Sequence, residues 1–395
     1  MNTLSDLNSE AHALFDWTQA LRRDIHRHPE LGFREERTAS LVARELTAMG
    51  LEVTTGVGKT GVVALLEGKE PGPVILLRSD MDALPIVEET GAEYASENPG
   101  VMHACGHDGH IAALLTAARL LVAHRDDLHG TVKFVFQPAE EGLGGAPAMV
   151  RDGVLTNPRP DLTIACHLWN ERPVGWVALT PGPLMAGSEA FFVTVKGKGG
   201  HGAVPQESID PILAAAHIVT AVQGIVSRNV SPMQSAVISV TRIRGGETHN
   251  VIPSKVEMAG TIRTFDADVR RTVLERLKAV VEGVAGGMGC SAHLDIRPLT
   301  PAVVNDASVV AQLNDLVLKI FPDLHIDPQY QTMISEDVSY FMDDIPGCFM
   351  LVGSSNPERG LNYCHHHPRF DFDEAVLPHA AALMAGAALG WKVEA

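Results

Sequence analysis

The sequence predicts an α/β protein in which a domain built on a mainly parallel β-sheet is interrupted by a smaller β-α-β-β-α-β domain. Two observations predict the larger domain: short, nearly continuous apolar runs, typical of strands buried on both faces, alternate with longer segments of helical spacing. A third predicts the smaller domain, because the middle of the chain changes to strands of alternating polarity. The 395 residues are enough for two domains.

The elements of the larger domain follow from the spacing of its apolar residues. These recur every three or four positions over 14–25 and again over 41–49, which predicts two amphipathic helices. The predicted strands are Val62–Leu66, Val74–Leu77, Val132–Phe136, Leu162–Ala165 and Cys348–Val352. Further helices are predicted over His107–Ala123, over Ala307–Ile320 and from about Glu374 onward.

The smaller domain is predicted from six consecutive elements. Strands are expected at Phe191–Lys196, Ala236–Ile243, Val256–Thr264 and Ala292–Ile296, and helices at Ile209–Val226 and Val269–Val284. Their order is that of a ferredoxin-like unit, which can form a domain of its own. We therefore predict an inserted domain over residues 186–298, enclosed by a discontinuous α/β domain of residues 1–185 and 299–395.

Composition excludes several classes of partner. The chain has 31 basic and 48 acidic residues, a formal net charge of −17, which argues against a nucleic-acid or anionic-membrane partner. We find no apolar run approaching the roughly 20 residues of a membrane span. The polar start, Met1–Asp6, does not resemble a signal peptide. Five sparse cysteines indicate reduced thiols, so we expect a cytoplasmic protein.

Ionisable residues follow four of the predicted strands. Asp80, the pair Glu140 and Glu141, His167, and a run of three histidines at 365–367 each come after one apolar run. In open α/β sheets, ligands bind beyond the carboxyl ends of the strands. Charge at one strand end is common, whereas charge at four predicts a functional site.

The residue types at this edge indicate a metal site. Cys105 and His107, at the start of a predicted helix, add a thiolate and an imidazole to the carboxylates, and these are ligands of zinc and its first-row neighbours. Adjacent buried carboxylates such as Glu140 and Glu141 need a compensating cation or proton. Taken singly, Cys105 could be a small buried hydrophobe or a nucleophile, the glutamates a solvated turn, and His167 a core histidine.

Several motifs spread along the chain resemble one known family. The similarity runs through Arg23-Asp24-Ile25-His26-Arg27-His28-Pro29-Glu30-Leu31, Asp80-Met81-Asp82-Ala83-Leu84-Pro85, Met102-His103-Ala104-Cys105-Gly106-His107-Asp108, Gln137-Pro138-Ala139-Glu140-Glu141-Gly142, Gly199-Gly200-His201-Gly202-Ala203, His249-Asn250-Val251-Ile252-Pro253, Gly260-Thr261-Ile262-Arg263 and Ser335-Glu336-Asp337. The chain resembles the M20 metallopeptidase family, in its amidohydrolase branch of hippurate hydrolases, N-acyl-amino-acid amidohydrolases and auxin-conjugate hydrolases.

The resemblance implies a set of metal ligands and a catalytic base. Two divalent metal ions (zinc, manganese, cobalt or nickel) would be held by Cys105, His107, Glu141, His167 and His366. Glu140 would be the general base toward a metal-activated water, and Asp80 would orient a ligand. The family usually has one histidine two places before a proline, whereas this chain has three in succession; counting from Pro368 selects His366 over its neighbours.

The inserted domain would supply the remaining site residues. By the resemblance, His201 would stabilise the oxyanion, often from the neighbouring subunit of a dimer, and Asn250 and Arg263 would meet the substrate's α-carboxylate. The domain would thus be a lid that also joins the chain into a homodimer or higher homo-oligomer. The alternative for Arg263 is a structural role, in an ion pair with an acid on the lid.

The resemblance implies an amidohydrolase that cleaves N-acyl or N-aroyl amino acids, small molecules such as hippurate, to a carboxylic acid and a free amino acid. One alternative is an N-acetyl-diaminopimelate deacetylase or a small-peptide exo-hydrolase of the same family. A remote alternative is a non-catalytic metal-binding descendant. The sequence contains neither a Gly-x-Ser-x-Gly elbow nor a His-Glu-x-x-His helix, so serine hydrolases and helix-based metalloproteases do not fit.

Overall fold

The computed structural model describes residues 3–392 and divides into two compact units. The first comprises the chain up to Gly182, Val304–Tyr330 and the chain from Asp337 onward. The second comprises Pro183–Val303 and Gln331–Glu336. The segment Gln331–Glu336 lies outside the predicted insertion of residues 186–298.

An eight-stranded sheet forms the centre of the first unit, in the order β1-β2-β4-β3-β5-β16-β6-β15. Its four central strands, β4, β3, β5 and β16, run parallel to one another, so the predicted mainly parallel α/β class is confirmed. The strands are β1 (Glu52–Val57), β2 (Gly61–Glu67), β3 (Glu70–Asp80), β4 (His129–Gln137), β5 (Leu162–Pro173), β6 (Trp176–Ala178), β15 (His325–Asp327) and β16 (Gly347–Ser355).

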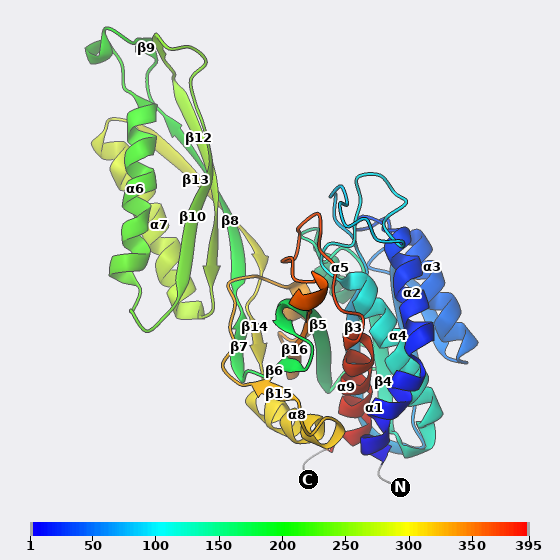
Figure 1. Cartoon of the computed structure of the whole chain (residues 1–395). Coiled ribbons are helices and arrows are strands. Elements are labelled where there is room, and N and C mark those ends of the chain that lie inside the picture. The colour runs from blue at the N-terminus through cyan, green and yellow to red at the C-terminus, as the bar shows by residue number, and fades with distance from the viewer. Residues whose placement is uncertain (1–2, 393–395) are drawn as a thin grey trace. The chain divides into compact units, whose positions relative to one another are not determined.

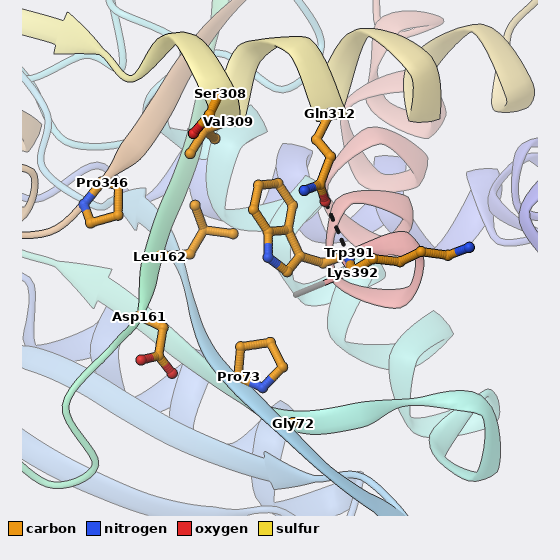
Figure 2. A pocket seen from close by; sticks show the side chains of 10 residues that line it. All are labelled: Gly72, Pro73, Asp161, Leu162, Ser308, Val309, Gln312, Pro346, Trp391 and Lys392. Atoms are coloured by element: carbon orange, nitrogen blue, oxygen red, sulfur yellow. Dashed lines mark hydrogen bonds between the residues drawn. The ribbon is translucent and has the colours of Figure 1, made fainter. Parts of the chain in front are cut away.

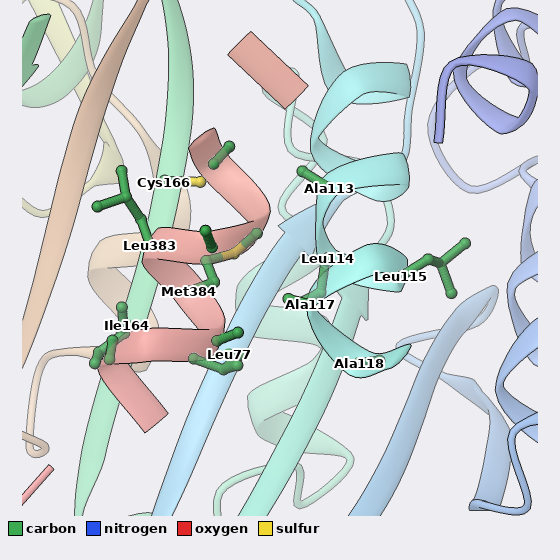
Figure 3. Close-up of a cluster of buried hydrophobic side chains, with 14 of the residues drawn as sticks. Leu77, Ala113, Leu114, Leu115, Ala117, Ala118, Ile164, Cys166, Leu383 and Met384 are labelled. Carbon is green, nitrogen blue, oxygen red and sulfur yellow. The ribbon is translucent and has the colours of Figure 1, made fainter. Parts of the chain in front are cut away.

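Seven helices of the described residues accompany this sheet (Figure 1). They are α1 (Thr3–Ala13), α2 (Phe15–Arg27), α3 (Glu36–Ala48), α4 (His107–Ala123), α5 (Gly145–Arg151), α8 (Ala307–Ile320) and α9 (Val376–Gly390). Apolar side chains of α4 and α9, such as Leu114 and Met384, are fully or almost fully buried against strand residues such as Leu77 and Ile164 (Figure 3). This core holds the start of α4, and with it His107, against the sheet.

The second unit is a four-stranded antiparallel sheet, β10-β12-β8-β13, covered by α6 and α7. Side chains of β12 alternate between buried and partly exposed, as a sheet with one covered face requires. Asp210 and Asp266 cap the helices by accepting hydrogen bonds from backbone amides of the first turn. The elements are β8 (Gly187–Lys196), α6 (Pro211–Asn229), β10 (Ala236–Arg244), β12 (Lys255–Thr264), α7 (Ala267–Gly287) and β13 (Ser291–Thr300).

Two short pairings complete the strands: β7 (Gly182–Met185) with β14 (Val303–Asn305), and β9 (Gly200–His201) with β11 (Val251–Ile252).

Helix α6 is long and apolar enough, by length and composition alone, to cross a membrane. The prediction that no apolar run approaches that length is therefore wrong. One face of α6, including Ile218 and Val222, nevertheless packs into the core of its own unit.

A cavity of about 460 Å³ opens at the amino ends of the parallel strands, where β3, β5 and β16 begin (Figure 2). Its lining includes Leu162, Gln312, Pro346 and Trp391. None of the predicted site residues lines this cavity. The ionisable residues that follow the strands lie at their carboxyl ends, so this cavity is not the predicted site.

A buried ionic network joins α2 to two segments that carry predicted metal ligands. The guanidinium of Arg22 is completely buried and donates to Asp108 (2.7 Å), Asp371 (2.8 Å) and Glu374 (3.2 Å). Asp108 also accepts from Nδ1 of His26 at 2.7 Å. Because Asp108 follows His107, and residues 371–374 follow His366, the network holds both segments together.

The pH dependence of stability tests this network. Burial lowers the pKa of His26, but the carboxylates of Asp108 and Glu88 raise it by more, so the pKa lies above its usual value of about 6.5 despite the nearby charge of Arg22. Protonated His26 therefore stabilises the folded state fully below about pH 6.5, and this contribution is lost as the pH rises through the raised pKa. The free energy of unfolding in urea should therefore differ between the wild type and His26→Gln by an amount that shrinks with rising pH. A difference that grows with pH would contradict this role of His26.

Candidate metal centre

The carboxyl ends of the central strands bring five predicted residues to one edge of the first unit. Asp80 ends β3, and Glu140 and Glu141 follow the end of β4. His167 lies within β5, and His366 lies in the segment between β16 and α9. This is the arrangement expected for ligands at the carboxyl edge of a parallel sheet.

His107 is presented by the first residue of α4. The preceding residue, Gly106, has a φ of 93°, a left-handed conformation that glycine adopts without strain. Nδ1 of His107 donates to the backbone oxygen of Asp82 at 2.8 Å. Nε2 is buried without a hydrogen-bond partner. Burial lowers the pKa of His107, but the carboxylates of Asp80, Asp82 and Glu141 raise it by more, to about 10. A metal ion bound at Nε2 would therefore displace a proton.

His167 and Cys105 lie beside His107. Nε2 of His167 is 3.5 Å from Sγ of Cys105, and the ligand atoms of all three residues lie within 4.8 Å of one another. Burial holds the pKa of His167 well below its usual range, so the ring is neutral, as a metal ligand must be.

A second group combines Cys105 with Glu141 and His366, again within 4.8 Å. Nε2 of His366 lies 3.1 Å from Oε1 of Glu141, which is buried. The neighbouring histidines make other contacts: His365 donates to the backbone oxygen of Leu168, and the ring of His367 stacks on Tyr363. The geometry therefore favours His366 among the three.

The segments that carry Glu140 and His366 each contain a residue with left-handed backbone. His366 has a φ of 66° and Ala139, directly before Glu140, a φ of 53°; non-glycine residues rarely adopt such values. The amide of His366 donates to the backbone oxygen of Ala104 at 2.7 Å, which ties its segment to that of Cys105.

Asp82 is a positioning residue that the sequence did not predict. Its carboxylate accepts the backbone N–H groups of Glu140 and Glu141, each at 3.0 Å, while its backbone oxygen holds His107. The available signal was the spacing in Asp80-Met81-Asp82, which puts a second acid two residues beyond the first at a strand end.

Asp80 is buried and multiply hydrogen-bonded. It accepts from Nδ1 of His110 at 2.6 Å and from Nη1 of Arg78 at 2.9 Å. Burial alone would raise the pKa of Asp80, but His107, His110 and Arg78 hold it well below its usual range. Its Oδ2 is 3.7 Å from Nε2 of His107. His110, to which the sequence assigned no role, is thus part of the site.

The donor set fits divalent transition-metal ions. Sulfur, imidazole nitrogen and carboxylate oxygen atoms form two groups that share Cys105, and Glu140 lies in a third with His107 and Glu141. Nε2 of His107 is a buried polar atom without a hydrogen-bond partner, and a divalent cation would satisfy it.

Two predicted residues lie together in the second unit. His201 on β9 pairs with Val251 on β11, and the amide of Gly202 donates to the backbone oxygen of Asn250 at 2.8 Å. Nδ1 of His201 accepts from the amide of Ala203 at 3.1 Å, so the neutral ring carries its proton on Nε2.

Arg263 lies far from that pair within the same unit. Strand β12 begins at Lys255, shortly after β11, whose Val251 pairs with His201. Arg263 is eight residues beyond Lys255 on β12, which at roughly 3.3 Å per residue is about 26 Å along the strand. Its guanidinium bonds to Thr261 and to the backbone oxygen of Ile262, and it forms no salt bridge with any described residue. The structure therefore brings His201 and Asn250 together, but not Arg263 with them.

A family model for "Peptidase family M20/M25/M40" matches residues 76–389, which include all the proposed metal ligands. The chain belongs to peptidase family M20. The resemblance inferred from the motifs is thereby confirmed.

Individual M20 relatives are similar along nearly their whole length. An N-acetylcysteine deacetylase of Bacillus subtilis is 40% identical over 92% of this chain and 94% of its own. An IAA-amino acid hydrolase of Arabidopsis thaliana is 40% identical over 96% and 87%. The crystal structure of the Bacillus subtilis YXEP protein, described as a dinuclear metal-binding peptidase from the M20 family, is 36% identical with a TM-score of 0.84, over 96% and 98%. This M20 chain is a hydrolase that acts on amide bonds.

Metal content tests the choice among the three histidines. His366→Ala should bind less metal than the wild type, because it removes an imidazole from the group that contains Cys105 and Glu141. His367→Ala is the matched control and should keep the metal content of the wild type, since its ring stacks on Tyr363. Elemental analysis of the purified variants measures the difference, and equal metal content in the two would refute the choice.

Proposed function

We propose that the chain hydrolyses the amide bond of N-acyl or N-aroyl amino acids, such as hippurate, to a carboxylic acid and a free amino acid. The observation that carries the proposal is the pair of donor groups sharing Cys105, with Glu140 beside them. The relatives named as a deacetylase of N-acetylcysteine and as a hydrolase of IAA-amino acids support the substrate class.

Glu140 acts as the proton carrier in this proposal. When bound, two metal ions would acidify a water molecule and polarise the amide carbonyl. Glu140 takes the proton from the attacking water and passes it to the leaving amine. Asp82 holds the backbone of Glu140 and Glu141 and the ring of His107, which keeps the carboxylate directed at the metal ligands.

The inserted unit stabilises and orients the substrate. Nε2–H of His201 donates to the oxyanion of the tetrahedral intermediate, a contribution of about 3–4 kcal/mol for a well-placed donor. Arg263, whose charge no described acid neutralises by a salt bridge, binds the α-carboxylate. Asn250 lies beside His201, so in this proposal it contacts the same carboxylate from the chain that supplies His201.

The separation of these residues supports a homodimer. An N-acyl amino acid is much shorter than the roughly 26 Å between the two ends of β12. One substrate can therefore contact both His201 and Arg263 only if they belong to two different chains. We propose a dimer joined through the inserted unit, in a cytoplasmic setting that keeps Cys105 reduced.

A substrate panel tests the reaction. Purified enzyme loaded separately with zinc, manganese, cobalt or nickel should cleave benzoyl- and acetyl-amino acids, and a chelator should abolish the activity. A preference for N-acetyl-diaminopimelate or for small peptides would replace the proposed substrate class by one of the alternatives. No turnover of any amide in any metal form would overturn the proposal.

Substitution of the base separates catalysis from metal binding. Glu140→Gln should keep both metal ions and lower kcat by about 10²–10⁴-fold, because the amide cannot accept the proton. Elemental analysis with steady-state kinetics measures both quantities, and Glu141→Gln, which should lose metal, is the control. Wild-type kcat in Glu140→Gln would show that another group carries the proton.

Mixing two inactive variants tests the dimer. His201→Ala and Glu140→Gln should each have low activity, and mixed dimers should recover part of it, because one site per dimer then has both groups intact. The assay is hydrolysis after the mixed chains have been allowed to exchange subunits. Absence of recovery in confirmed mixed dimers would place His201 and Glu140 of the same chain at one site.

A further inference from the structure

Three histidine side chains form hydrogen bonds with the backbone of Leu168. Its N–H donates to Nε2 of His110 at 2.9 Å. Its carbonyl oxygen accepts from Nδ1 of His167 at 2.7 Å and from Nε2 of His365 at 3.0 Å. Both polar groups of one residue are therefore engaged by imidazoles, two of which are not among the proposed metal ligands.

These contacts determine which nitrogen of His167 carries the proton. A carbonyl oxygen can only accept, so Nδ1 of His167 is protonated and its Nε2 keeps a lone pair. That lone pair lies 3.5 Å from Sγ of Cys105, among the proposed ligand atoms. The direction of the Leu168 carbonyl thus sets both the tautomer and the orientation of His167.

His365 is placed to hold that carbonyl. Its ring centre is 5.2 Å from that of His167 at an interplanar angle of 73°, 4.9 Å from that of Trp169 and 5.1 Å from that of Phe370. Packed among these rings, the imidazole cannot turn without losing the hydrogen bond to Leu168. It also closes off one side of His167, which limits the rotation of that ring.

We propose that His365 is a positioning residue for His167: through the carbonyl of Leu168 and by direct ring contact, it holds the Nε2 lone pair of His167 toward Cys105. The inference rests on the ligand assignment made above. His110 contributes from the amide side, but it also donates to Asp80, so its substitution would disturb two features at once. His365 is therefore the residue to test.

The test compares three variants by metal affinity, measured in competition with a chromophoric chelator. H365L removes both the donor and part of the ring contact, and should weaken one of the two metal ions by about 10–100-fold, the usual cost of losing a group that orients a ligand. H365Q keeps an N–H that can reach the same carbonyl and should recover most of the affinity. H367L, the same kind of change two residues away, should bind both ions as the wild type does.

A second measurement does not depend on the folding of the His365 variants. Long-range ¹H–¹⁵N NMR of the metal-free wild type, labelled in its histidines and assigned with His167→Ala, should show His167 protonated on Nδ1. Protonation on Nε2 would overturn the proposal. So would wild-type affinity in H365L, an equal loss in H367L, or an H365Q variant as weak as H365L.

Failure of the ligand assignment would be distinguishable. If His167→Ala binds both metal ions with wild-type affinity, His167 is not a ligand, and the proposed centre itself is wrong. If His167→Ala loses an ion while H365L does not, the centre stands and only the role of His365 is rejected.

Discussion

The ion pairs of the completely buried Arg22 guanidinium hold together the two segments that carry His107 and His366, and the candidate metal centre depends on them. Its bonds to Asp108, Asp371 and Glu374 connect the residue after His107 with the segment after His366. These two ligands are about 260 positions apart in the sequence, so no local preference could bring them together. Removing one partner of such a network leaves an uncompensated buried charge, typically at a cost of about 3–5 kcal/mol.

Much of the architecture could be predicted because it depends on local patterns. The helix expected at His107–Ala123 has those bounds, since its apolar face packs on the sheet and a left-handed glycine precedes it. The central strands were recognisable because burial on both faces requires continuous apolar runs. The first helix, Thr3–Ala13, was not predicted, although Leu4, Leu7 and Ala11 follow helical spacing.

The residue types of the candidate site could be predicted from the sequence, but the residues that position them could not. The donor types indicated a metal, and counting back from Pro368 selected His366, whereas the different contacts of His365 and His367 form only in the folded chain. The supporting roles of Asp82 and His110 arise from hydrogen bonds between their side chains and backbone amides of segments distant in the sequence, which only the fold brings together. The distance of Arg263 from His201 likewise depends on strand register, which a motif does not contain.

The left-handed backbone at Ala139 and His366 has a consequence for metal exchange. Both segments are held by hydrogen bonds within the protein, from Ala139 to Glu35 and from His366 to Ala104, rather than by the ligand atoms themselves. The conformational cost of gathering the donors is therefore met when the chain folds, not when an ion arrives. Such a centre can trade one divalent ion for another without refolding, so cellular supply, rather than the geometry of the cage, would decide which metal it carries.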